Sequence, residues 1–207
     1  MFSRNFATAL AVGAGLGTSL IAQANADVIK AGFTIGGVEK TFQQSQTLNF
    51  EGISAFHNPS ADCAPLCIAP LSAVAGVETI GEREVIGFVA EVVSQGSGLL
   101  IDSREPEDRA AGYIPASVNV PASLVQPDNP FLTDIMQALG ARSFEGMLNF
   151  SDAMPLVIFD NGPSTSVASE LITQLIAQGY PADKLSYYRG GMLVWTALGL
   201  TIEDAKS

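Results

Sequence analysis

The chain has 207 residues, of which 47% are hydrophobic and 15% are charged, and its formal net charge at pH 7 is −11. This length supports one well-filled core and is too short for two ordinary domains. A strongly acidic chain repels phosphate backbones and anionic lipids, so we expect neither nucleic acid nor a membrane surface as a partner.

Residues 1–26 have the pattern of a secretory signal peptide. A single basic residue, Arg4, precedes an apolar run from Phe6 to Ala22, and the small residues Ala24 and Ala26 fit a cleavage site. The run is short and rich in Ala and Gly, and no aromatic or basic cluster follows it. We therefore expect cleavage after Ala26, no stable membrane anchor and a periplasmic or secreted protein; a retained N-terminal anchor is the alternative.

Residues 27–76 are expected to form an N-terminal extension of the main domain. Loosely alternating apolar residues from Asp27 to Ser54 favour short strands, with a hairpin that turns at Gly36 and Gly37. Residues 56–76 are rich in Pro, Ala, Ser and Asn, which favours an irregular loop or arm.

Cys63 and Cys67 lie in this arm and are the two cysteines of the chain. In an exported protein a disulfide is the default interpretation, and its short loop would make its contribution to stability modest. The alternative is a reactive dithiol for sulfur transfer or redox chemistry, since short-loop disulfides are readily strained and reduced. A soft-metal site with His57 would lack a ligand, so we expect no metal and no cofactor.

From residue 77 to residue 207 strand-like and helix-like segments alternate. Strands are expected at 99–102, 117–120, 156–159 and 185–187, and helices at 79–96, 105–111, 131–140, 167–179 and around Trp195 and Leu198. Thr79 and Glu82 have the spacing of a capping box for the first of these helices. The apolar run at 156–159 is typical of a strand buried on both faces of a parallel sheet. The alternation predicts an α/β fold, a three-layer sandwich with a central, mostly parallel sheet, plus short strands from the N-terminal arm.

Two parts of this region resemble the signatures of the rhodanese family. Residues 99–107 read LLIDSREPE and residues 112–121 read GYIPASVNVP, similar to an Ile-Asp-x-Arg strand end followed by Gly-His-Ile-Pro-Gly-Ala-x-Asn-x-Pro. Tyr113 stands in place of the His and Ala116 in place of the second Gly. Residues 188–200 carry YRGGM, a Trp and Gly-Leu, similar to the family's Gly-Gly-x-x-x-Trp ending. The resemblance covers residues 77–202, and residues 77–207 are thus identified as a rhodanese-like domain.

The resemblance implies a sulfur-carrying cysteine after the strand 156–159, where this chain has Asp160. In rhodaneses, backbone N–H groups and a helix N-terminus around that cysteine lower its pKa and stabilise a persulfide. An exported branch of the family has a loop that reads Cys-Asn-Gly-Pro. The loop here contains no thiol, and it lacks the Gly and the Arg that the ordinary loop has at the positions of Pro163 and Thr165. It consists of Asp160, Asn161, Gly162, Pro163, Ser164, Thr165 and Ser166. A carboxylate cannot form a persulfide, so we expect this chemistry to be lost.

The same resemblance places Asp102, Arg104 and Arg189 beside the loop, either as pocket residues or as structural ion pairs and caps. Asp160 is expected to accept the loop's own N–H groups; metal-dependent Asp chemistry would need further acids that the nearby sequence lacks. We therefore expect a degenerate rhodanese, a pseudoenzyme with no catalytic residue, that binds another exported protein or a small ligand. The alternatives are a sulfurtransferase or thiol-redox protein that uses Cys63 and Cys67, and an Asp160-dependent hydrolase.

Overall fold

The computed structural model describes residues 30–45, 50–56, 68–145 and 147–204. The signal-peptide pattern, His57 and the two cysteines lie outside the described residues. The strands are β1 (Lys30–Ile35), β2 (Val38–Gln43), β3 (Glu78–Ile80), β4 (Leu99–Asp102), β5 (Val118–Asn119), β6 (Arg142–Phe144), β7 (Met147–Asn149), β8 (Leu156–Phe159) and β9 (Leu185–Tyr188). The helices are α1 (Phe50–Phe56), α2 (Glu82–Glu91), α3 (Pro106–Arg109), α4 (Leu132–Ala138), α5 (Val167–Ala177) and α6 (Gly191–Ala197), with short 3-10 helices at Val93–Gln95, Ala122–Val125 and Ala182–Lys184.

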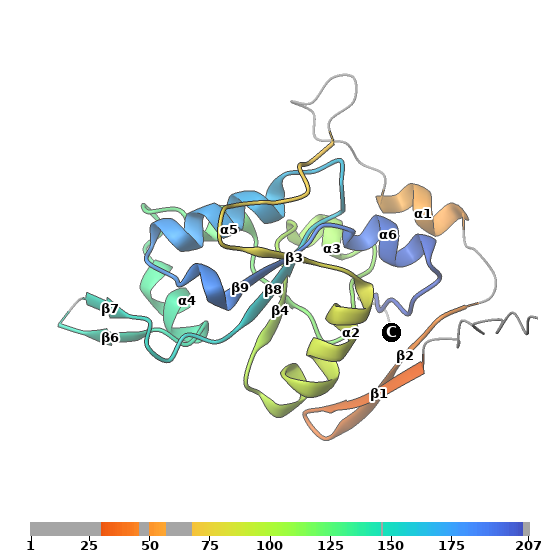
Figure 1. The fold of residues 1–207 in the computed structure, drawn as a ribbon, viewed down its shortest axis with the longest axis horizontal. Coiled ribbons are helices and arrows are strands. Elements are labelled where there is room, and N and C mark those ends of the chain that lie inside the picture. Colours follow the sequence, from red (N-terminus) through yellow and green to blue (C-terminus); the bar gives the residue numbers. More distant parts are fainter. Residues whose placement is uncertain (1–29, 46–49, 57–67, 146, 205–207) are drawn as a thin grey trace, which may run out of the picture.

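A five-stranded sheet forms the middle layer of the molecule (Figure 1). Its strand order is β3-β9-β8-β4-β5, and every neighbouring pair is parallel. Parallel strands end at the same edge of a sheet, which is where open α/β sheets place their functional residues. The ends of β4, β8 and β9 therefore bring Asp102, Asp160 and Arg189 to one edge.

Hydrophobic side chains cover both faces of this sheet. Within β8, Leu156 and Ile158 belong to a core cluster that includes α4 and α5, whereas Val157 and Phe159 belong to a second cluster with α2 and α6. Each residue of the run therefore meets an apolar layer, which explains why the strand is continuously hydrophobic. The predicted three-layer α/β sandwich is confirmed.

The predicted N-terminal hairpin is present and is part of the core. β1 and β2 pair antiparallel and turn between Ile35 and Val38. Phe33 and Phe42 are buried, and the ring of Phe42 meets that of Trp195 edge-on with 5.4 Å between centroids. The hydrophobic cluster on the α2 and α6 face of the sheet thus includes residues of the N-terminal extension, which lies outside the region with the rhodanese signatures.

Two sequence-based expectations were wrong in detail. Residues 50–56 form helix α1 and not a strand, and the helix buries Phe56 in the core. The few apolar residues of this segment are too loosely spaced to distinguish the period of a helix from that of a strand. Thr79 lies in strand β3 and donates its hydroxyl to the Leu71 carbonyl at 2.6 Å, so it does not cap α2. The capping residue is Gly81, whose N–H donates to the Glu84 side chain at 3.1 Å.

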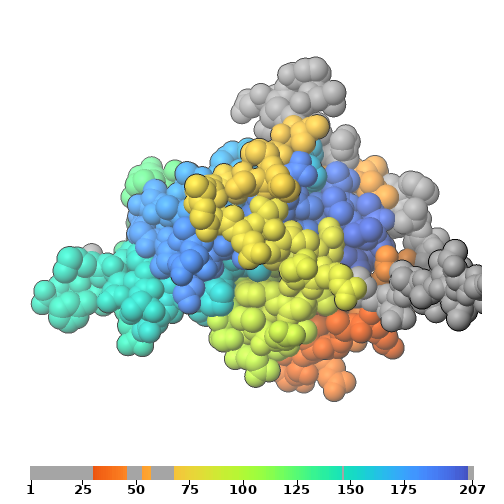
Figure 2. Space-filling model, viewed as in Figure 1, coloured from red at the N-terminus to blue at the C-terminus, as the bar shows by residue number. Residues whose placement is uncertain are grey.

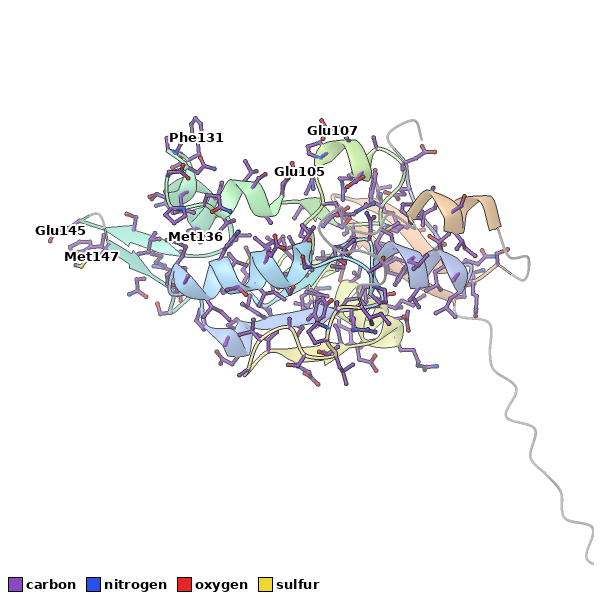
Figure 3. All side chains as sticks on the ribbon, turned by 90° about the horizontal axis from the view of Figure 1, so that it is seen from above. Glu105, Glu107, Phe131, Met136, Glu145 and Met147 are labelled. Atoms are coloured by element: carbon purple, nitrogen blue, oxygen red, sulfur yellow. The ribbon has the colours of Figure 1, made fainter. Side chains whose placement is uncertain are left out.

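The hairpin of β6 and β7 had no sequence-based prediction. It projects from the body of the molecule, with Glu145 and Met147 near its tip (Figures 1 and 3). Its strands are largely exposed, so they lack the in-out alternation that marks a half-buried strand. No helix in the described part of the chain is long and apolar enough to cross a membrane.

Ala116 has a backbone conformation that favours glycine. Its φ is 70°, in the left-handed region, which costs an L-residue about 1–2 kcal/mol. The turn around it is closed by the Ser117 N–H, which donates to the Ile114 carbonyl at 3.1 Å. This left-handed conformation explains why the rhodanese signature has a Gly at this position.

We predict that Ala116→Gly raises the free energy of unfolding by up to about 1 kcal/mol, because it relieves this strain. The matched control is Ala90→Gly, another half-buried alanine packed against the same core cluster but inside a helix. It should lower the free energy of unfolding by about 1 kcal/mol. Urea denaturation measures both, and a loss of stability in Ala116→Gly would contradict the account of the turn.

Candidate functional site

The carboxyl group of Asp160 lies at the centre of the loop that joins β8 to α5. Its side chain is 0% exposed. Its Oδ1 accepts the Gly162 N–H at 2.8 Å, and its Oδ2 accepts the Ala168 N–H at 3.0 Å. The second bond caps the first turn of α5, a role that the side chain of the N-cap residue Ser166 does not take. A negative charge is favoured at this end of a helix.

Burial raises the pKa of the Asp160 carboxyl above its ordinary value of 3.8. The N–H groups of Ala168 and Gly162, the Thr165 hydroxyl and the charge of Arg104 act in the opposite direction and do not cancel the effect of burial. Removal from water penalises the ionised form more than these contacts stabilise it.

Gly191 allows α6 to approach the loop closely. The Met192 N–H donates to the Asp160 carbonyl at 3.0 Å, and the Leu193 N–H donates to the Asn161 carbonyl at 2.9 Å. A Cβ atom on Gly191, whose φ is 56°, would lie 2.5 Å from both the Asp160 carbonyl oxygen and the Gly162 nitrogen. A side chain at this position would push α6 away, so the second Gly of the Gly-Gly signature serves to fix the loop.

A buried ion pair connects the first signature to the loop. Arg104 is 2% exposed, and its Nε and Nη2 donate to the two carboxylate oxygens of Asp102 at 2.9 and 2.7 Å. Its Nη1 donates to Oδ1 of Asn161 at 3.1 Å. Arg109 adds a further bond to Asp102 at 2.9 Å. The pair therefore holds the loop through Asn161, and its guanidinium has little access to solvent.

Arg189, at the end of β9, binds the N-terminal arm. Its Nε and Nη2 donate to the carbonyl of Ala69 at 3.0 and 2.8 Å, and the Ala69 N–H donates to the Pro163 carbonyl at 2.6 Å. Tyr187, two residues before Arg189, is buried. Burial and the nearby Asp160 raise the pKa of Tyr187 to about 12, and Arg189 opposes this shift. The arm, β9 and the loop thus meet at one place.

The structure therefore brings most of the sequence-predicted site residues into one network. Thr165 donates its hydroxyl to the Gly162 carbonyl at 2.9 Å inside the loop, whereas Ser166 is exposed and bonds to Glu170. The Ser164 hydroxyl is buried and has no hydrogen-bond partner among the described residues. Within the same residues, no group of three or more His, Cys, Asp and Glu side chains could hold a metal ion.

Four participants were not identified from the sequence: Ala69, Arg109, Ala168 and Tyr187. Ala69 and Ala168 act through their backbone groups, which leave no trace in residue type. Tyr187 carried part of a signal, because it alternates with Tyr188 along β9, so the two side chains face opposite sides of the sheet. The structure shows that Tyr187 faces the α5 side.

Comparison with known proteins identifies the family. Residues 89–198, more than half of the chain, match the model of the rhodanese-like domain. A search of curated proteins gives no match.

Similar solved structures include a rhodanese-like domain protein from Staphylococcus aureus, with 20% identity over 62% of this chain and 100% of that one and a TM-score of 0.42. RPA3614 from Rhodopseudomonas palustris, described as a possible tyrosine phosphatase, has 18% identity over 63% of this chain and 88% of that one and a TM-score of 0.46. The human single-domain sulfurtransferase TSTD1 has 22% identity over 57% of this chain and 95% of that one and a TM-score of 0.37.

We predict that Asp102→Asn lowers the free energy of unfolding by about 3 kcal/mol or more, because it leaves Arg104 buried without a charge partner. Asp152→Asn is the control, since the ion pair of Asp152 with Arg142 is exposed and should contribute less than about 1 kcal/mol. Chemical denaturation measures the two variants side by side. Equal effects would show that the buried pair does not hold the loop.

A second prediction concerns pH. The raised pKa of Asp160 means that the folded protein holds this proton more tightly than the unfolded chain does, so ionisation lowers stability as the pH rises through the folded pKa. Asp160→Asn lacks this titration. The stability advantage of the wild type over Asp160→Asn should therefore shrink as the pH rises above 3.8, the ordinary pKa of the carboxyl group. Denaturation at a series of pH values above 3.8 measures this advantage, and an advantage that grows with pH would refute the direction of the shift.

Proposed function

Because the chain belongs to the rhodanese-like domain family, we propose that it is an exported member that performs no sulfur transfer at its loop and serves as a binding or accessory module. The observation that carries this proposal is the Asp160 carboxyl, which follows the central strand β8 where the family resemblance implies the persulfide cysteine. Its two oxygens accept the N–H groups of Gly162 and Ala168.

The chemistry of sulfur transfer requires a thiolate at this place. A thiolate attacks the donor sulfur, carries it as a persulfide and yields it to an acceptor. Residues 160–166 contain no thiol, and the carboxyl group already occupies the N–H groups that would face a sulfur atom. Its burial also removes it from solvent, which argues against an Asp160-dependent hydrolase.

The parts that shape the loop are retained although its reactive atom is not. Arg104 binds Asn161, and Gly191 allows α6 to donate two N–H groups to the loop. This combination supports a role in which the fold presents a surface and performs no reaction. The net charge of −11 favours a neutral or basic partner over an acidic one. The proposal of export rests on the N-terminal sequence pattern. The proposal of a Cys63–Cys67 disulfide depends on export, because disulfides persist in oxidising compartments.

The test is cyanide-dependent release of thiocyanate from thiosulfate and from mercaptopyruvate by the full chain. We expect no turnover above background in the wild type or in the Cys63→Ser/Cys67→Ser variant. Asp160→Cys is the comparison, because its thiol would face the N–H groups of Gly162 and Ala168, and turnover by this variant would show that the loop still supports a persulfide.

Turnover by the wild type would contradict the proposal, and the variants would then locate the chemistry. Loss of that turnover in Cys63→Ser/Cys67→Ser would assign sulfur transfer to the cysteine pair. Loss of turnover in Asp160→Asn, with turnover retained in Cys63→Ser/Cys67→Ser, would assign sulfur transfer to the loop.

A further inference from the structure

Residues 68–72, which we call the strap, lie on the surface across the C-terminal half of the fold (Figure 2). The strap is attached at two of its residues. Ala69 donates its N–H to the Pro163 carbonyl at 2.6 Å, and its own carbonyl accepts both Nε and Nη2 of Arg189. The carbonyl of Leu71 accepts the Thr79 hydroxyl at 2.6 Å. All of these bonds involve backbone groups of the strap.

The large side chains of the strap contribute little to this attachment. Ile68 is 74% exposed and Leu71 is 73% exposed, so neither fills a pocket. The groups that hold Ala69 recognise one N–H and one C=O, which every non-proline residue carries. An extended segment of another protein can present the same two groups, as in other modes of peptide recognition through the main chain.

We propose that the Pro163 carbonyl and the Arg189 guanidinium form a binding site for an extended peptide segment, and that Ala69 occupies this site in the free protein as an internal ligand. The inference rests on the proposed function as a binding module and names its class of partner. The segment has a small, non-proline residue at the site, where Ala69 is half-buried, and it carries no net negative charge, because the chain is strongly acidic.

An internal ligand competes with an external one at an effective concentration in the millimolar range. A peptide in solution therefore binds measurably only when the strap is weakened without a change at the site. Ala69→Pro removes the strap's N–H, and Thr79→Val removes the hydroxyl that holds Leu71. Neither substitution changes Pro163 or Arg189.

The experiment measures hydrogen exchange and peptide binding in the full chain. In the Ala69→Pro/Thr79→Val variant, residues 68–76 should exchange faster than in the wild type, whereas β8 should exchange at an unchanged rate. A blocked, fluorescently labelled peptide with the sequence of residues 68–74 should bind this variant at least about tenfold more tightly than the wild type, as measured by fluorescence anisotropy.

Three controls test the assigned contacts. Adding Arg189→Ala, or methylating the peptide nitrogen that corresponds to Ala69, should weaken binding at least about tenfold, the effect expected for a hydrogen bond to a charged group or a lost buried donor. Adding Arg83→Ala, which removes an exposed arginine on α2, should leave binding unchanged.

Four results would overturn the inference: unchanged exchange of residues 68–76, no binding by the variant with a fast-exchanging strap, equal binding after Arg189→Ala, or equal binding of the methylated peptide. If the peptide-binding experiment fails, the proposal that the loop performs no sulfur transfer still stands. Conversely, sulfurtransferase turnover would overturn the proposed function without affecting a demonstrated peptide site.

Discussion

The buried carboxyl group of Asp160 is the interaction on which the loop depends. Its oxygens satisfy one N–H inside the loop and one in the first turn of α5, and both N–H groups would otherwise be buried without partners. The backbone carbonyls of Asp160 and Asn161 in turn accept the N–H groups of Met192 and Leu193 in the first turn of α6. One residue therefore joins the central strand, the following helix and the last helix at the edge of the sheet where this family carries out its chemistry.

The surroundings of Asp160 explain why the fold tolerates a carboxyl group at this place. Arg104 brings a positive charge near it and fixes Asn161, and the N–H groups of Gly162 and Ala168 bind its oxygens, which together oppose the effect of burial on its pKa. The N-terminal arm then covers the same region through Ala69 and Arg189. The chain thus keeps the architecture of a rhodanese-like domain, and the polar groups at this edge of the sheet bind one another.

Three elements could be predicted from the sequence: β8 from its continuous apolar run, α5 from its helical period and the N-terminal hairpin from the glycine pair at its turn. The two signatures also led to Asp102, Arg104 and Arg189 near the loop. Short or exposed elements could not be predicted, because the hairpin of β6 and β7 has no buried face and α1 is too short for its period to show. The contacts of Ala69 and Ala168 could not be predicted for a different reason, because they involve backbone groups, which are the same in every non-proline residue.

The most direct test of the central claim is an NMR titration of the Gly162 and Ala168 amide protons in the full chain. Both protons should move with a single common midpoint that lies above 3.8, the ordinary pKa of an aspartate, because both bind the same buried carboxyl group. In Asp160→Asn this titration should be absent. Amide protons that do not titrate, or that titrate with two different midpoints, would contradict the account.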